Sequence, residues 1–253
     1  MAINVDTVYK TVLLILNKEQ RGYMTPDEFN KVATQVQLDI FERYFDDLNQ
    51  QIKVGQTSRE YADRVLDVDE KIAVFKVRGD CDYLGDGVFK LPVSYNGVST
   101  NGTAVYKLGV VTYNDPDIGD SVEVERLTSK QFYENQRSDL TRSSRNFPTY
   151  VYENETNTNR KTIKVSPSTI TNNVVADFIR KPKNVVWGYS VGSLGQYVYD
   201  GDADVSTQIE LHPSEQVNVI LKILLYSGII VRDPQIIQAA ASEVQKNEIN
   251  QKS

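Results

Sequence analysis

The chain has 253 residues, of which 40% are hydrophobic and 25% charged, a composition typical of a globular protein with one large domain or two modest ones. Its 34 acidic and 28 basic residues give a net charge of −6, which argues against a clamp that grips nucleic acid through phosphates. The single cysteine, Cys81, excludes an intramolecular disulfide, and the single histidine, His212, excludes sites built from several histidines.

The sequence lacks the two patterns that direct a chain into or across a membrane. No run of about 18 apolar residues occurs, so we expect no transmembrane span and no membrane partner. The first residues lack the basic and apolar pattern of a signal peptide, so none is expected.

A first helix is expected over residues 4–17, where valines and leucines recur at spacings of three and four, with Asn4 or Asp6 as its cap. A stronger signature begins the second helix. Thr25 is the expected N-cap and Pro26 the first helical residue, and Glu28 completes a capping box. An apolar stripe then continues for about six turns. Its members are Phe29, Val32, Ala33, Val36, Ile40, Phe41, Tyr44, Phe45 and Leu48.

Residues 58–70 predict a third helix, which is rich in charge. From about residue 72 the pattern changes to short alternating or β-branched runs, separated by turn pairs such as Asn96–Gly97 and Asn101–Gly102. This region predicts a mostly antiparallel sandwich or open barrel. One short helix at 128–137 interrupts it, and a long exposed loop is expected at 135–146.

The helical period returns after Asp200. One helix is expected to begin at Pro213 and to stop at Gly228. The spacing of its apolar residues predicts one apolar face, which comprises Val217, Ile220, Leu221, Leu224 and Leu225. Asp233 and Pro234 then predict the start of another helix.

The order of helices, strands and helices predicts an α+β fold. We expect residues 1–72 and 207–253 to form one helical bundle, with a β-rich domain, residues 73–206, inserted between them. The sequence shows neither internal repeats nor a repeating βαβ pattern.

Two acidic loops are candidates for metal sites. Asp80, Asp82 and Asp86 loosely resemble a calcium loop, but no downstream glutamate or flanking helices accompany them, so a hairpin turn is the preferred interpretation. Asp200, Asp202 and Asp204 alternate in a second loop, which also lacks the glutamate of an EF-hand. Calcium binding there stays open as an alternative to a plain turn.

The remaining reactive residues predict structure rather than chemistry. His212 lies at a strand-to-helix junction without a nucleophile elbow, so it is expected to cap or turn the chain. Cys81 is expected to be a small residue near a turn. We therefore assign no catalytic, cofactor-binding or metal-binding residue, expect no cofactor, and expect a protein that is not an enzyme.

Basic residues gather at 180–183, 137–145 and 159–164, in the half of the chain that also contains Trp187. Basic groups next to aromatic rings are one way to bind nucleic acid. Acidic residues separate the three clusters, however, and contacts at the rim of a subunit interface explain them equally well.

The two ends of the chain resemble a known group of proteins. "VYKTVLLILNKEQRGYMTPDEFNKVATQVQLDIFERYF" (8–45) is similar to the opening of virion structural proteins from short-tailed and crAss-like bacteriophages. "IRKPKNVVWGY" (179–189) and "IELHPSEQVNVILKILLYSGIIVRDPQIIQAA" (209–240) look like their closing segments. With the helix–strand–helix layout, the resemblance covers most of the chain except roughly 80–160.

The resemblance implies a head-to-tail connector, similar to the adaptor or tail-tubular ring proteins beneath the portal. Such a protein is made in the cytoplasm of the host bacterium and ends in the neck or tail of the virion. Its partners would be other copies of itself in a ring, a dodecamer in this group, together with the portal protein and adjacent tail rings. Double-stranded DNA would pass through the channel without sequence recognition. The alternative is a tail-fibre adaptor or a carbohydrate-contacting virion module.

Overall fold

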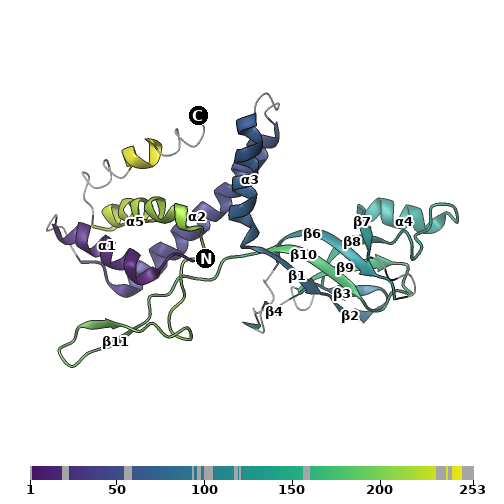
Figure 1. Cartoon of the computed structure of the whole chain (residues 1–253). Helices are drawn as coiled ribbons and strands as arrows, with labels where there is room; N and C mark the ends of the chain where they lie inside the picture. The colour runs from purple at the N-terminus through teal and green to yellow at the C-terminus, as the bar shows by residue number, and fades with distance from the viewer. Residues whose placement is uncertain are drawn as a thin grey trace. The chain divides into compact units, whose positions relative to one another are not determined.

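A computed structural model describes residues 2–18, 23–53, 59–92, 94–95, 98–99, 105–116, 119, 121–155, 160–231, 238 and 241–246 (Figure 1). The chain is an α+β protein that divides into two compact units. Met1–Val74 and Pro182–Ser253 form one, called here the helical unit, and Phe75–Lys181 form the other, the β unit. The first break lies close to the expected one. The second differs, because residues 182–206, which we expected in the β-rich domain, belong to the helical unit.

Helix α1 spans Val5–Lys18. Asn4 is its cap, since the Asn4 Oδ1 atom accepts a hydrogen bond from the backbone N–H of Thr7 at 3.0 Å. Four of the five apolar side chains in the predicted pattern are buried, namely Val5, Val8, Val12 and Leu16. The fifth, Leu13, is half-buried.

Helix α2 spans Pro26–Lys53 and begins at the predicted capping box. The backbone N–H of Thr25 donates to Glu28 at 2.9 Å, and the N–H of Glu28 donates back to the Thr25 hydroxyl at 3.4 Å. Most of the predicted stripe is buried, Val32 is half-buried, and the side chain of Leu48 lies outside the described residues. The buried members are Phe29, Ala33, Val36, Ile40, Phe41, Tyr44 and Phe45.

The helical unit also contains α3 (Arg59–Ala73), the short 3₁₀ helix η1 (Pro213–Glu215) and α5 (Gln216–Val231). Helix α5 packs against α2 and α1, so the terminal helices form one bundle, as predicted (Figure 1). Residues 241–246 are helical as well, with Val244 buried. The expected cap at Asp233 and Pro234 lies outside the described residues.

The predicted end and face of α5 were wrong. Gly228 does not stop the helix, which continues to Val231, and Gly228 is buried inside the bundle, where packing offsets the cost of about 1 kcal/mol for a helical glycine. Val217 is 64% exposed, whereas Val219 and Ile223 are buried. Because α5 is apolar on almost every side, the spacing of its apolar residues does not single out one face.

Two ion pairs, each with one buried partner, lie between these helices. The Lys71 ammonium lies 3.1 Å from the Glu215 carboxylate, and Lys222 on α5 pairs with Asp39 on α2. The Glu215 and Lys222 side chains are only 4% and 3% exposed. Burial by itself would lower the pKa of Lys71, but the charges and hydrogen bonds of Glu215 and Asp67 together outweigh this effect and raise that pKa above its usual value. These ion pairs join α3 to η1 and α5 to α2.

The β unit contains ten strands in the described residues. They are β1 (Lys76–Asp80), β2 (Asp82–Gly85), β3 (Val88–Lys90), β4 (Ser94–Tyr95), β5 (Val98–Ser99), β6 (Val105–Asn114), β7 (Ser121–Arg126), β8 (Thr149–Glu155), β9 (Arg160–Ser166) and β10 (Val174–Arg180). Eight of them form one sheet in the order β1-β10-β6-β7-β8-β9-β3-β2, and β4 and β5 pair separately. Every pair in the large sheet is antiparallel except β7–β8. The mostly antiparallel prediction is therefore confirmed.

The large sheet curls toward an open barrel. A Cβ atom on Gly79 of edge strand β1 would lie 3.0 Å from Cγ of Pro92, which follows β3 near the other edge. The Lys161 ammonium on β9 likewise reaches the carbonyl of Val105 on β6 at 2.7 Å. The curled sheet encloses one core, to which β3, β6, β7, β8, β9 and β10 all contribute side chains.

The parallel pair β7–β8 is joined by α4 (Ser129–Arg137) and by residues 138–148. Thr128 and Gln131 form a second capping box at the start of α4, and Phe132 anchors the helix with a buried ring. Parallel strands need such a long crossover connection, whereas a tight hairpin would make them antiparallel. Figure 1 shows α4 beside β7 and β8 at one end of the sheet.

Candidate functional site: a hairpin anchored on the helical unit

Residues 183–187 run along one face of α2 in extended form, and three polar side chains of that helix bind their backbone. The N–H of Trp187 donates to Asn30 Oδ1 at 2.7 Å, and the N–H of Val185 donates to the Thr34 hydroxyl at 3.0 Å. Gln37 Nε2 donates to the carbonyl of Lys183 at 2.7 Å. The three side chains share one helix face because they are spaced by four and three residues. The three side chains provide the hydrogen bonds that a neighbouring strand would provide in a sheet.

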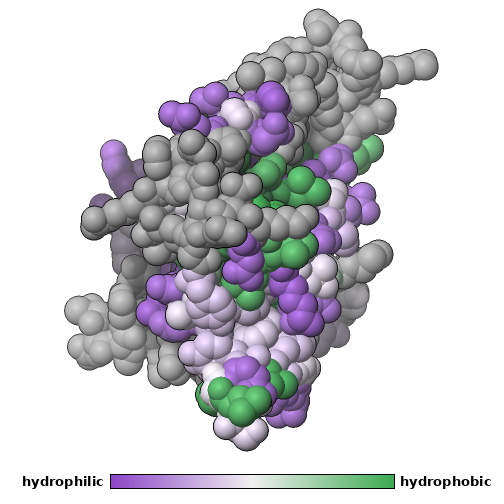
Figure 2. Space-filling model, turned by 90° about the vertical axis from the view of Figure 1, so that its left-hand side faces the viewer, coloured by the Kyte–Doolittle hydropathy of each residue, from purple (hydrophilic) through white to green (hydrophobic). Residues whose placement is uncertain are grey.

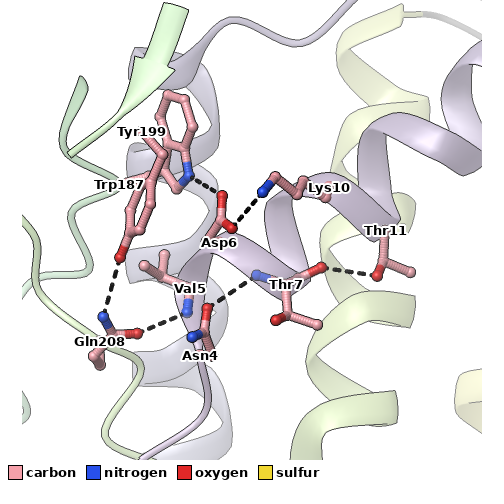
Figure 3. Close-up of polar contacts among 9 residues, drawn as sticks. All are labelled: Asn4, Val5, Asp6, Thr7, Lys10, Thr11, Trp187, Tyr199 and Gln208. Carbon is pink, nitrogen blue, oxygen red and sulfur yellow. Dashed lines mark hydrogen bonds and ion pairs between the residues drawn. The ribbon is translucent and has the colours of Figure 1, made fainter. Parts of the chain in front are cut away.

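Trp187 ends this segment and forms the base of a hairpin. Its ring centroid lies 4.5 Å from that of Tyr9 on α1, and its indole Nε1–H donates to Asp6 Oδ1 at 3.1 Å (Figure 3). Tyr199 stacks on the same indole with centroids 5.5 Å apart and planes at 27°, and Tyr189 does so at 5.9 Å and 24°. The indole is 4% exposed. Both strands of the hairpin are thus fixed to α1 through one aromatic ring.

Gln208 adds a polar connection between the hairpin and the start of α1. Its Nε2 donates to the Tyr199 hydroxyl at 3.3 Å, while its Oε1 accepts from the backbone N–H of Val5 at 2.8 Å (Figure 3). That N–H belongs to the first turn of α1, where no intrahelical acceptor is available. One side chain therefore satisfies the helix end and holds the second strand of the hairpin.

Close backbone packing fixes the neck of the hairpin. The Gly188 N–H donates to the Ser206 hydroxyl at 2.9 Å, and the Gly188 carbonyl accepts from the N–H of Asp200 at 3.0 Å. A Cβ atom on Gly188 would lie 2.5 Å from Cγ1 of Val205, so any larger residue there would push the two chain segments apart. The hairpin is consequently held at its base and free beyond it.

The hairpin itself consists of β11 (Tyr189–Val191) and β12 (Tyr197–Tyr199). Its outer part is strongly apolar for a projecting element, with Leu194 90%, Val191 64% and Val198 46% exposed. Figure 2 shows hydrophobic side chains gathered at its end, at the bottom of the view. An exposed apolar tip on an anchored base is typical of a surface that a protein partner covers. We therefore treat residues 187–199, called the anchored hairpin, as the candidate functional site.

The acidic loop after the hairpin is organised by its own backbone. Asp200 Oδ1 accepts from the N–H of Asp202 at 3.1 Å, and Asp202 Oδ1 accepts from the N–H of Asp204 at 3.3 Å. Of the other acidic group, Asp80 ends β1 and Asp82 begins β2. Asp86 lies in the hairpin turn between β2 and β3, with a φ of 50°. Within the part of the chain that the structure describes, no three acidic, histidine or cysteine side chains are grouped to hold a metal ion.

His212 and Cys81 have the structural places expected of them. His212 caps η1, because its Nδ1 accepts from the N–H of Ser214 at 3.3 Å and also contacts the Ser214 hydroxyl at 2.8 Å. Cys81 is buried after β1, and burial raises the pKa of its thiol to about 12, with a further contribution from the charges of Asp80 and Asp82. A thiol held neutral in this way is a poor nucleophile.

The three basic clusters do not make one surface. Arg180 is buried with its guanidinium 5.6 Å from the centre of the Phe75 ring, and Lys161 donates to the Val105 carbonyl. The cluster at 137–145 is largely exposed, after α4.

Among the described residues, no helix is long and apolar enough to span a membrane.

Sequence reasoning missed the anchored hairpin as a unit. The run from Trp187 to Tyr199 lies in the region that was expected to be β-rich, but nothing local predicted that the Trp187 ring would contact the Tyr9 ring and bind Asp6. No model of a known protein family matches this chain, and no curated protein sequence matches it at a significant level.

Proposed function

We propose that this protein is a structural component of a bacteriophage virion, a head-to-tail connector that forms a ring around the DNA exit channel. In this role it binds other copies of itself, the portal protein and neighbouring tail rings. The observation that carries the proposal is the anchored hairpin, whose Leu194 side chain is 90% exposed on a base fixed by Trp187. Exposing an apolar tip to water costs free energy, and a protein partner that covers the tip removes this cost.

Two further features support the same role. The α+β layout with both terminal helices in one bundle agrees with the layout that the resemblance implies. The helical unit carries 14 Lys and Arg against 21 Asp and Glu, a net charge of −7. Negative charge repels phosphates, so it suits a protein past which DNA moves without being held.

Assembly of the full chain, alone and mixed with the portal protein, tests this function. We expect native mass spectrometry to detect closed oligomers in at least one of the two samples. Leu194→Ser should prevent closure without changing the thermal midpoint, since Leu194 makes little contact within the monomer. Val217→Ser is the matched control, because Val217 is another exposed apolar residue of the helical unit, at 64%, away from the hairpin. Oligomers that form equally well with Leu194→Ser would remove the hairpin from the account.

One observation favours the second candidate, a carbohydrate-contacting virion module. Tyr189 and Tyr197 are 39% and 40% exposed on the hairpin, with ring centroids 4.9 Å apart. Paired exposed aromatic rings can pack against the apolar faces of sugars. Binding to a glycan array that is lost in Tyr197→Ala would favour this candidate over the connector.

A further inference from the structure

A second exposed apolar surface lies at one end of the β unit, in the connection from α4 to β8. We call residues 138–148 the α4–β8 loop. Leu140 is 97% exposed and Phe147 79% exposed, and Tyr133 on α4 is 48% exposed. The neighbouring ring of Phe132 is buried and packs α4 onto the unit, so the apolar side chains of this segment divide into an inner anchor and an outer group.

The outward direction of Phe147 is fixed by the backbone. The N–H of Ser144 donates to the carbonyl of Phe147 at 3.3 Å, and the N–H of Phe147 donates to the carbonyl of Ser144 at 3.1 Å. The hydroxyls of Ser143 and Thr149 lie 2.7 Å apart and connect the loop to the start of β8. The loop therefore has a closed shape of its own, and that shape presents an aromatic ring to solvent.

The surface around these side chains is basic. Between Arg126 and Phe147 there are five Lys and Arg residues and two acidic residues, which leaves a net charge of +3. All five basic side chains are exposed, and they are Arg126, Lys130, Arg137, Arg142 and Arg145. The β unit as a whole has 14 basic and 13 acidic residues, a net charge of +1, whereas the helical unit has −7.

We propose that the α4–β8 loop docks onto the acidic helical unit of a second copy of this chain. Charge of opposite sign on the two units steers them together, and Leu140 and Phe147 supply the apolar contact that gives the complex its affinity. The contact joins different surfaces of the two copies, so repeating it generates a ring or a filament. The docking contact itself does not depend on the proposed function; only the closure of the repeated contact into a ring rests on it.

Nucleic acid is the competing partner for a basic loop. A DNA contact relies on positive charge that phosphates can reach, and here two acidic residues, Glu134 and Asp139, lie within the same basic segment. The most exposed side chain of the loop is Leu140, an aliphatic group that offers a phosphate or a base edge no hydrogen bond. A protein surface uses both the charge and the apolar groups.

Sedimentation velocity of the full chain over a range of concentrations at low and moderate salt tests the proposal. Two double variants address this surface, Arg137→Glu with Arg142→Glu, and Leu140→Ser with Phe147→Ser. Each should weaken self-association at least about tenfold, the effect of losing one interface hot spot, and leave the thermal midpoint unchanged. Added salt should weaken the association of the wild-type chain.

The control is Lys31→Glu with Lys246→Glu, two exposed lysines of the helical unit whose side chains are 76% and 67% exposed. It changes the net charge by the same amount as the arginine variant but makes the helical unit more acidic. Self-association should therefore persist in the control, whereas general repulsion between like-charged copies would weaken it equally.

Three results would overturn the inference: a chain that stays monomeric at every concentration, loop variants that associate like the wild type, or loop-dependent binding of a duplex DNA probe in a gel-shift assay. A monomeric chain found as a ring in the virion would leave the proposed function standing. Failure of the docking and failure of the connector role are thus told apart.

Discussion

The indole Nε1–H of Trp187 donates to Oδ1 of Asp6 at 3.1 Å and joins two residues that are 181 positions apart in the sequence. Asp6 also pairs with Lys10 one turn further along α1, so the carboxylate has a partner on each side (Figure 3). This contact connects the first helix to the strand pair that projects from the same unit. It makes the position of the hairpin depend on the N-terminal helix.

Trp187→Ala should destabilise the helical unit by about 3–5 kcal/mol, the usual cost of removing a buried aromatic side chain. The loss has two parts, the packing against Tyr9 and Tyr199 and the hydrogen bond to Asp6. Urea denaturation followed by far-ultraviolet circular dichroism measures the change. Val191→Ala, at the exposed part of the hairpin, is the control and should cost less than about 0.5 kcal/mol. Equal midpoints for the two variants would show that the indole does not anchor the hairpin.

Gln37 makes the clearest single test of the contact between α2 and residues 183–187. It is 1% exposed, donates to the Lys183 carbonyl at 2.7 Å and accepts from the N–H of Glu210 at 2.8 Å. Gln37→Leu leaves both backbone groups without that partner. A fully buried unpaired group costs about 1–3 kcal/mol, and because both hydrogen bonds are only partly buried, we expect a loss near the lower end of that range. Gln35→Leu, on an exposed position of the same helix, should be nearly neutral in the same denaturation experiment. A neutral Gln37→Leu would mean that water replaces the amide.

The helix starts show how far the sequence could predict this fold. Asn4 and the Thr25–Glu28 capping box act within a few residues of themselves, so local rules located α1 and α2 correctly. The mostly antiparallel sheet followed from the alternating runs for the same reason, whereas the turn pairs Asn96–Gly97 and Asn101–Gly102 lie outside the described residues.

Errors arose where distant residues decide the outcome. Lys222 and Ser227 look like the outer face of α5, but both are buried, because Lys222 pairs with Asp39 on α2 and the Ser227 hydroxyl contacts the sulfur of Met24 at 3.9 Å. Residues 182–206 read as part of a β domain, since no local pattern reveals that Asn30, Thr34 and Gln37 bind that segment. The anchored hairpin was missed for the same reason, because its anchor combines side chains that are far apart in the sequence.

The Lys222–Asp39 pair should respond asymmetrically to mutation. Asp39→Ala leaves the buried ammonium without its closest carboxylate, and breaking a buried pair in this way costs about 3–5 kcal/mol. Asp39 is 37% exposed, so the value should lie near the lower end of that range. Adding Lys222→Met should recover most of the loss, since an apolar side chain of similar length then fills the site. A double-mutant cycle by urea denaturation measures the coupling, and purely additive effects would contradict it.

Cys81 predicts a pH dependence that can be measured on one side chain. Its thiol pKa is raised to about 12 in the folded protein, against about 8.5 in an unfolded chain. Between these two values the folded state keeps a proton that the unfolded state has lost, so stability falls as pH rises, by up to about 1.4 kcal/mol per pH unit. Below about pH 8 the stabilising contribution is fully present.

Cys81→Ala isolates this effect from other titrating groups. The wild type should lose stability relative to the variant between about pH 8.5 and 9.5, before tyrosines begin to ionise. In the native state, the thiol should also react with Ellman's reagent far more slowly than after unfolding, because it is buried and neutral. Parallel pH profiles for the two proteins, or fast native labelling, would contradict the burial of this thiol.

The central proposal is that this chain forms a ring at the junction of a phage head and tail, and cryo-electron microscopy of intact phage particles that contain the chain tests it most directly. The account predicts density below the portal that repeats around the channel axis and fits both the helical unit and the β unit, with the hairpin tip containing Leu194 covered by a protein neighbour. Particles that lack the chain, or that carry it in a tail fibre instead of a ring around the channel, would contradict the claim.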